Sequence, residues 1–355
     1  MNLQANPDSL GAESRPAGPV NEPSTWQADE IAESQWQHYL TGAEINELTV
    51  ATDNAMQRGL LPTQFGAEDF RLPTLSARLA TIVDSVENGV GFAMVRGLPI
   101  QTYDEETLKV LYWGLGCHFG SAISQNSKGQ LLAEVSDRGN SYADRNSRGF
   151  ATNAELMPHV DTSDMTTLLC VRTARLGGES RVVSSSQVFN TVLAEHPEFL
   201  EPLFVGFHND LRGEGPTGDI SELTHHKVPV FSYKANRLSC SLNMRMIENG
   251  ALKSGRPFSA LERQALDFVR EVSLREESGV RFFMQPGDIQ MVSNHSVFHA
   301  REKFEDHIQP EKRRCLYRLW VNLANGRVLE PRFADRYNTG PRGGVAIGDG
   351  AQYTF

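Results

Sequence analysis

The segments VRFFMQPGDIQMVSN, residues 280–294, and RRCLYRLWVNL, residues 313–323, decide the fold class of this 355-residue chain. Both are short runs rich in β-branched and aromatic residues, and a Pro-Gly pair interrupts the first, as is typical of strands joined by a turn. Further short strands are predicted near residues 89–99 and 228–247. Because strands and helices do not alternate regularly, the pattern favours a mainly β, sandwich-like core with added helices over a parallel doubly wound sheet.

Helices are predicted on both sides of these strands in the sequence. Apolar residues recur at spacings of three and four residues, which is the signature of an amphipathic helix with one buried face. The clearest case is the stripe formed by Leu75, Leu79, Ile82, Val83 and Val86. The predicted helices cover approximately residues 29–58, 75–88, 104–119, 186–193 and 259–272.

The chain is predicted to contain one large domain, residues 29–355, preceded by a leader. Residues 1–28 are rich in Pro, Ser, Asn, Ala and Gly, so we expect them to be flexible, because such a composition buries too little apolar surface to offset the entropy lost on ordering. The polar tract GNSYADRNSRGFATNAE begins at Gly139, and no packed element can be built from it. We interpret residues 139–157 as an active-site loop or lid.

Composition excludes several classes of function. The chain has 34 basic and 44 acidic residues and a formal net charge of −10, which disfavours nucleic acid and anionic membrane surfaces as partners. Its four cysteines form no CxxC pair and suggest neither a zinc knuckle nor a disulfide framework. With no signal-peptide pattern and no long apolar run, we expect a cytoplasmic protein that acts on a small molecule; homo-oligomerisation is left open.

One constellation of residues indicates metal chemistry. His159 and Asp161 are two positions apart, so a strand would place both side chains on one face, with Cα atoms roughly 7 Å apart. His299, at the end of a predicted strand, supplies a third donor. Two imidazoles and one carboxylate on one face of an octahedron leave three positions open, which is typical of non-haem Fe(II) sites that activate O₂.

Two arginines follow the second histidine. Arg314 and Arg318 are four residues apart, so a strand presents both on one face, together with Leu316 and Trp320. Guanidinium binds carboxylates in a bidentate manner, and an interior arginine near a ferrous site is suited to the distal carboxylate of a 2-oxo diacid. The alternative is a pair of exposed strand charges.

Four ordered motifs, HVD, GGES, GDIQMVSNHSVFHAR and RRCLYRLW, together carry a resemblance to a known family. In this order and at these separations they resemble the Fe(II)/2-oxoglutarate-dependent dioxygenases of the taurine dioxygenase and clavaminate synthase-like superfamily. The likeness covers roughly residues 75–340. It implies a double-stranded β-helix, or jelly roll, with helical additions, which agrees with the strand pattern.

The resemblance also implies the cofactors and the reaction. His159, Asp161 and His299 would be the iron ligands, and 2-oxoglutarate and O₂ would be consumed with release of succinate and CO₂. Family members that halogenate have a small residue in place of this aspartate. With Asp161 present, hydroxylation, desaturation or ring closure of an unactivated C–H is favoured.

Further roles follow from the same resemblance. Arg314 would bind the distal carboxylate of 2-oxoglutarate, and its four-residue partner distinguishes it from the adjacent Arg313. Ser180 matches a cosubstrate-contacting threonine of the family, although it equally fits a turn residue after the Gly-Gly pair. Arg318 matches the arginine that reaches an anionic group of the substrate.

The substrate is therefore expected to be a small, polar, anionic metabolite. Besides Arg318, the substrate contacts are predicted to include Glu155 in the lid and Asn243 and Arg245 in the segment 241–245. The alternative function is a non-catalytic jelly-roll protein that binds a metal or ligand without turnover.

Overall fold

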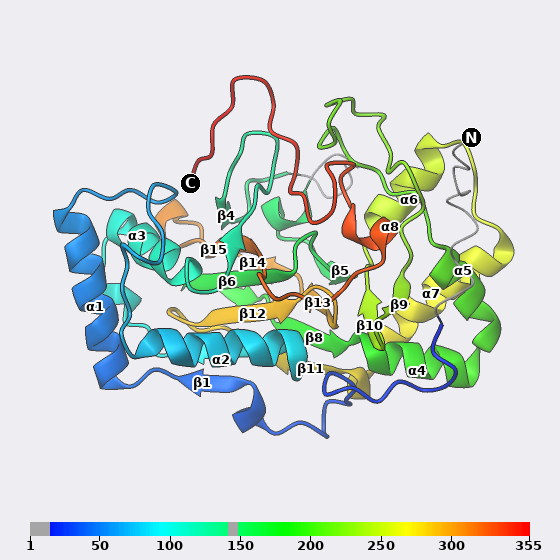
Figure 1. Ribbon diagram of the computed structural model, residues 1–355, viewed down its shortest axis with the longest axis horizontal. Coiled ribbons are helices and arrows are strands. Elements are labelled where there is room, and N and C mark those ends of the chain that lie inside the picture. The colour runs from blue at the N-terminus through cyan, green and yellow to red at the C-terminus, as the bar shows by residue number, and fades with distance from the viewer. Residues whose placement is uncertain (1–14, 141–147) are drawn as a thin grey trace.

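The computed structural model describes residues 15–140 and 148–355, and β-sheets form its centre (Figure 1). The larger sheet has seven strands in the order β1-β2-β12-β6-β15-β3, with β4 also paired to β15. All of its pairs are antiparallel except β1 with β2. Its strands are β1 (Gln37–Tyr39), β2 (Phe92–Arg96), β3 (Ser121–Ala122), β4 (Leu132–Val135), β6 (Met165–Arg172), β12 (Ile289–Ser293) and β15 (Cys315–Asn322).

A smaller antiparallel sheet has the order β11-β8-β13-β5. Its strands are β5 (Leu156–His159), β8 (Ser180–Ser184), β11 (Gly279–Phe282) and β13 (Val297–Arg301). Side chains of both sheets meet in one apolar cluster, in which Phe92 and Val292 of the larger sheet join Val182 and Val297 of the smaller one. Two sheets packed in this way form the predicted double-stranded β-helix.

Two short ribbons complete the β structure. They are β9 (Phe231–Lys234) with β10 (Arg237–Cys240), and β7 (Leu176–Gly177) with β14 (Phe304–Glu305). Strand β7 of the second ribbon ends at the Gly-Gly pair, and Gly177 and Gly178 both have positive φ. Glycine adopts this left-handed conformation without strain, so the pair allows the chain to turn sharply into β8.

Helices cover the outer faces of the sheets. The first group packs with the larger sheet in one core cluster and comprises α1 (Gly42–Gln57), α2 (Leu75–Asn88) and α3 (Glu105–Gly116). The second group packs near the smaller sheet and comprises α4 (Ser185–Glu195), α5 (Leu200–Val205), α6 (Met244–Lys253) and α7 (Ala260–Leu274). Figure 1 shows the two groups at opposite ends of the view, with α2 running alongside β12. The short α8 (Pro331–Ala334) follows β15.

Single-turn 3₁₀ helices link several of these elements. They are η2 (Glu33–Gln35), η3 (Ile100–Thr102), η4 (Gly149–Ala151), η5 (Pro197–Phe199), η6 (Glu276–Ser278) and η7 (Pro310–Lys312). None of the helices within residues 15–140 and 148–355 has the length and apolar character that crossing a membrane requires.

Local sequence signals account for most helix boundaries. The predicted helix 75–88 is α2, and four residues of its stripe, Leu75, Leu79, Ile82 and Val86, are buried, while Val83 is half-buried. Helix α1 starts later than predicted, because Thr41 forms a capping box with Glu44 and the preceding residues form β1 instead. The first turn of helix α6 falls within the range 228–247 that was predicted to hold short strands, and the start of the helix is marked by Asn243, whose side chain accepts a hydrogen bond from the backbone of Met246.

The prediction of a flexible leader is wrong for the part that the structure describes, residues 15–28. Val20 is buried, and its backbone exchanges two hydrogen bonds of 2.8 Å with the side chain of Asn190 in α4. Trp26 is also buried and donates its indole N–H to the carbonyl oxygen of Val90. Composition averages over the segment, whereas these two side chains hold it by specific contacts. Residues 1–14 of the predicted leader lie outside the described residues.

The predicted lid, residues 139–157, is described only in part. Residues 141–147 lie outside the described residues, and Gly149–Ala151 form η4. The lid prediction is wrong for its final residues, because Leu156 and Met157 already belong to β5 and pair with the smaller sheet.

Candidate functional site

The two histidines of the predicted metal set are direct cross-strand partners. In the antiparallel pair of β5 and β13, the residue opposite His299 is His159, and their ring centroids lie 4.4 Å apart. Opposite residues project to the same face of a sheet. Strand pairing therefore brings together two imidazoles that are 140 residues apart in the sequence (299 − 159).

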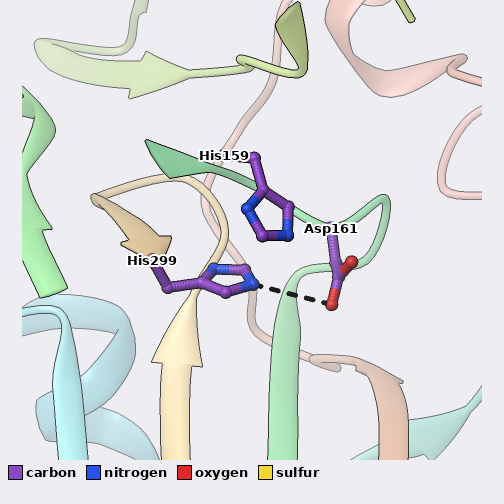
Figure 2. Close-up of side chains that lie close together, drawn as sticks. All are labelled: His159, Asp161 and His299. Atoms are coloured by element: carbon purple, nitrogen blue, oxygen red, sulfur yellow. Dashed lines mark ion pairs between the residues drawn. The ribbon is translucent and has the colours of Figure 1, made fainter. Parts of the chain in front are cut away.

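Asp161 lies just beyond the end of β5 and turns its carboxylate toward the histidines. Figure 2 shows the three side chains converging, with the carboxylate of Asp161 3.8 Å from Nε2 of His299. One ligand atom from each residue can be chosen so that all three lie within 4.8 Å of one another. A metal ion placed between them could be bound by two nitrogens and one oxygen on one side, as predicted from the sequence.

The hydrogen bond of His159 and the charge state of His299 both suit metal binding. Nδ1 of His159 lies 2.8 Å from the carbonyl oxygen of Met157, and because a carbonyl can only accept, Nδ1 carries the proton and Nε2 is left as a donor to a metal. Burial, with the neighbouring imidazole, lowers the pKa of His299 to about 3. His299 is therefore neutral near pH 7, as a ligand must be.

Two hydrogen-bond donors fix the carboxylate of Asp161. The hydroxyl of Thr166 and the indole N–H of Trp320 donate to the same oxygen, Oδ2, at 2.9 and 3.0 Å. Burial alone would raise the pKa of Asp161, but Arg318, whose Nη1 lies 3.7 Å from Oδ2, and the two histidines lower it well below its usual range. The carboxylate is ionised and oriented.

Hydrogen bonds also fix the backbone at Asp161, where the chain leaves β5. The amide of Asp161 donates to the side-chain oxygen of Asn294 at 3.0 Å, and the side-chain amide of Asn294 in turn donates to Thr166 at 3.1 Å. This closed network explains why the chain can leave β5 and still present Asp161 to the histidines.

The metal set opens into a cavity of about 440 Å³ between the two sheets. As the alternation of side chains along a strand predicts, Leu316 and Trp320 of β15 line it together with Arg318 and with Arg314, which directly precedes the strand. The prediction of a shared face is confirmed, and both arginines are buried. The alternative of exposed strand charges is wrong.

Arg314 and Ser180 line the same cavity. The guanidinium carbon of Arg314 lies 5.1 Å above the ring of Phe304, and within the described residues no acidic side chain forms a salt bridge with it. Burial lowers the pKa of Arg314, the response expected of a cation removed from water. Gly178 lies beside Arg314, and its φ of +79° is a left-handed conformation that glycine adopts without strain.

Some of the predicted substrate contacts line the cavity and one does not. Asn243 and Arg245, at the start of α6, line the cavity. Glu155 does not: it is exposed, and it precedes β5 outside the cavity lining. The prediction for Glu155 is therefore not supported, because its carboxylate remains in solvent while the neighbouring Leu156 faces the cavity.

Several lining residues were not predicted from the sequence. Arg148 lies in the polar tract taken as a lid, and Arg212 lies in the loop beginning RGEGPTGD. Tyr337 follows α8 and bonds through its hydroxyl with Thr162. These residues come from irregular segments, where periodicity carries no signal.

The sequence matches a known family over most of its length. The model for "Taurine catabolism dioxygenase TauD, TfdA family" matches residues 57–320. The chain belongs to this family. The TauD/TfdA assignment confirms the resemblance seen in the sequence, and the protein is accordingly an Fe(II)- and 2-oxoglutarate-dependent dioxygenase that uses O₂.

The chain is also similar to individual proteins, one of them by sequence and two by solved structure. FR-33289 synthase from Streptomyces rubellomurinus is 32% identical over 314 residues, which cover 87% of this chain and 92% of that protein. Among solved structures, asparagine oxygenase in complex with Fe(II), 2S,3S-3-hydroxyasparagine and succinate aligns with a TM-score of 0.63 at 18% identity, over 85% of this chain and 98% of the other. The non-heme iron oxygenase OrfP in complex with Fe and alpha-ketoglutaric acid aligns with a TM-score of 0.57 at 14% identity, over 88% and 100%. These two structures share the fold.

Proposed function

We propose that this TauD/TfdA dioxygenase oxidises an unactivated C–H of a small, polar, anionic metabolite by hydroxylation, desaturation or ring closure, with release of succinate and CO₂. The observation that carries the proposal is the convergence of His159, Asp161 and His299 at a cavity lined by buried arginines. The cavity is large enough for a cosubstrate and a small substrate together.

His159, Asp161 and His299 are proposed as the metal ligands. The donor set fits Fe(II), since Nε2 of His159 is free, His299 is neutral and the carboxylate of Asp161 is ionised. Bound there, Fe(II) supplies the activation of O₂ that couples decarboxylation of the oxoacid to oxidation of the substrate. The protein contributes the orientation of the ligands through Thr166 and Trp320.

Arg314 and Ser180 are proposed to bind 2-oxoglutarate. Arg314 is a buried cation that forms no salt bridge with the described acidic side chains, so a carboxylate would compensate its charge. The hydroxyl of Ser180, at the start of β8, is suited to donate a hydrogen bond to the same group.

Arg318 is proposed to draw an anionic group of the substrate toward the reaction centre. Its Nε donates to the side chain of Gln125 at 2.7 Å, which fixes the guanidinium, and its Nη1 faces Asp161 at 3.7 Å. Asn243 and Arg245, which line the cavity from α6, are proposed as further substrate contacts.

Succinate release tests the proposal. Purified protein with Fe(II), 2-oxoglutarate and ascorbate should release succinate, and His159→Ala should abolish the release, because the metal would lose one of its two imidazole ligands. His225→Ala is the matched control, since His225 is exposed and is not part of the metal set. A His159→Ala protein with full activity would contradict the proposal.

The alternative, a jelly-roll protein that binds a metal without turnover, makes a different prediction. Stoichiometric zinc in the purified protein, with no visible band when 2-oxoglutarate is added to the anaerobic Fe(II) form, would favour it. The family assignment supports the enzyme.

A further inference from the structure

Two cavity-lining arginines, Arg148 and Arg212, have no role in the function proposed above. Arg148 directly precedes η4, and Arg212 lies in the loop after the β-bridge between Asp210 and Leu223. Both line the same cavity as Arg318. The exposed fractions of the side chains are 21% for Arg148, 14% for Arg212 and 7% for Arg318, so all three cations are largely removed from water.

The three guanidinium groups form one cluster. The backbone oxygen of Gln125 accepts from Arg148 at 3.3 Å, while its side-chain oxygen accepts from Arg318 at 2.7 Å. The ring of Phe150 lies 5.9 Å from the guanidinium carbon of Arg148 and 4.7 Å from that of Arg318. Contacts with Gln125 and Phe150 thus keep the guanidinium groups of Arg148 and Arg318 near each other, although their like charges repel.

The cluster carries more positive than negative charge. Glu214 forms a salt bridge with Arg148, and its other oxygen lies 3.8 Å from Arg212. Asp161 also faces Arg318, but the metal takes up its charge in the proposed function. Three cations against one available carboxylate leave an excess of two positive charges in a largely buried space, an arrangement that costs free energy unless an anion compensates it.

Two local features support a ligand at this place. Nε of Arg212 is buried and has no hydrogen-bond partner among the residues that the structure describes. Arg212 also has a φ of 54°, a left-handed conformation that non-glycine residues adopt at a cost and that clusters at ligand sites. Burial, and to a smaller extent the nearby Arg212 and Arg318, lower the pKa of Arg148 to about 9.

We infer that Arg148 and Arg212, together with Arg318, form a subsite for a substrate group that carries two negative charges. The inference rests on the proposed function, because it assigns Arg318 to the substrate and Arg314 to 2-oxoglutarate. A phosphoryl group and a pair of carboxylates both provide this chemistry, since each offers two charges and several acceptor oxygens to planar guanidinium donors. A singly charged anion would leave one positive charge uncompensated.

Methyl phosphate and methyl sulfate test the inference, because they have similar shapes and differ in charge. At pH 8 methyl phosphate is a dianion, since the second pKa of a phosphoryl group is about 6, whereas methyl sulfate carries one charge. The anaerobic protein is loaded with Fe(II) and saturated with 2-oxoglutarate, which occupies the Arg314 side, and each anion is titrated by calorimetry. We expect methyl phosphate to bind at least about tenfold more tightly than methyl sulfate, the scale of one added charge-assisted hydrogen bond.

Arg148→Gln and Arg212→Gln should each remove most of that preference. Arg212→Lys, which keeps the charge, should retain more of it, and it guards against a variant that fails to fold. Arg58→Gln is the control, because Arg58 pairs with the partly exposed Asp69 and does not line the cavity, so the preference should be unchanged. Equal binding of the two anions by the wild-type protein, or a preference that survives both glutamine substitutions, would overturn the inference.

Malonate identifies the chemical source of the two charges. Tighter binding of malonate than of methyl phosphate indicates a dicarboxylate substrate, and the reverse indicates a phosphoryl group; either outcome supports a dianion subsite. The visible band formed by Fe(II) and 2-oxoglutarate is recorded in the same samples. A protein that forms the band but does not prefer the dianion refutes the subsite alone, whereas one that prefers the dianion without forming the band refutes the proposed function.

Discussion

Replacing Thr166 with valine should weaken Fe(II) binding without touching a metal ligand. The hydroxyl of Thr166 donates to Oδ2 of Asp161 at 2.9 Å, and Trp320 donates to the same oxygen at 3.0 Å. Valine has nearly the same shape but cannot donate, so the carboxylate would keep one of its two anchors. Asp161 would then be free to rotate away from the position that faces His299.

The magnitude follows from the kind of bond that is lost. A hydrogen bond to a charged group contributes about 1.5–3 kcal/mol. Loss of a residue that orients a metal ligand typically reduces metal affinity about 10- to 100-fold. We expect the Kd of Thr166→Val for Fe(II) to rise at least about tenfold, and Trp320→Phe to have an effect of the same order.

Anaerobic calorimetric titration of the metal-free protein with Fe(II) measures this effect. Thr167→Val is the matched control, because Thr167 is the next residue of β6 and is equally buried. Its hydroxyl forms a hydrogen bond with that of Tyr112, in the core cluster between the larger sheet and helices α1 to α3. The Thr167→Val protein should lose stability but keep its metal affinity. The reasoning would be refuted by a Thr166→Val protein that binds Fe(II) within twofold of wild type, or by an equal loss in Thr167→Val.

Three further predictions concern the cosubstrate, pH and backbone. Arg314→Gln should raise the KM for 2-oxoglutarate by at least about 30-fold, since truncating one partner of a buried charge pair costs about 2–5 kcal/mol, while Fe(II) binding measured by calorimetry stays unchanged. Burial lowers the pKa of His295 from 6.5 to about 4, so this group stabilises the fold above pH 6.5 and the contribution is lost as the pH falls toward 4. Denaturant unfolding should therefore show a loss of about 2 kcal/mol between pH 7.5 and 5 that is absent in His295→Gln. Gly287→Ala should be less stable than Gly255→Ala by about 2 kcal/mol in thermal unfolding, because both have positive φ but only at Gly287 would the new methyl group overlap the carbonyl oxygen of Leu98; equal melting temperatures would contradict this.

Strand periodicity was sufficient to predict much of the site. The shared face of Arg314 and Arg318 follows from alternation alone, and the structure places both in the cavity. The pairing of His159 with His299 does not follow from spacing, because the register of two strands 140 residues apart (299 − 159) depends on the packing of the whole sheet. That His159 and His299 bind one metal together is instead implied by the resemblance of the four ordered motifs to the taurine dioxygenase family.

The residues that were missed lie where local patterns carry little information. Arg148 and Arg212 come from polar loops, and their placement depends on long-range contacts such as that of Arg148 with Glu214. The first turn of helix α6 was included in the predicted strand region because the helix is short, and only the cap at Asn243 marks its start. The leader was misjudged because averaged composition hides anchors such as Trp26.

The direct opposition of His159 and His299 makes this centre sensitive to the length of β5 and β13 as well as to the identity of its ligands. Successive side chains of a strand alternate between faces, so inserting or deleting one residue within β5 or β13 would point one imidazole away from the other. Conservative replacements of neighbouring side chains leave that opposition intact. Engineered diversity in these two strands should therefore be introduced by substitution, and loop grafts should join the chain outside Leu156–His159 and Val297–Arg301.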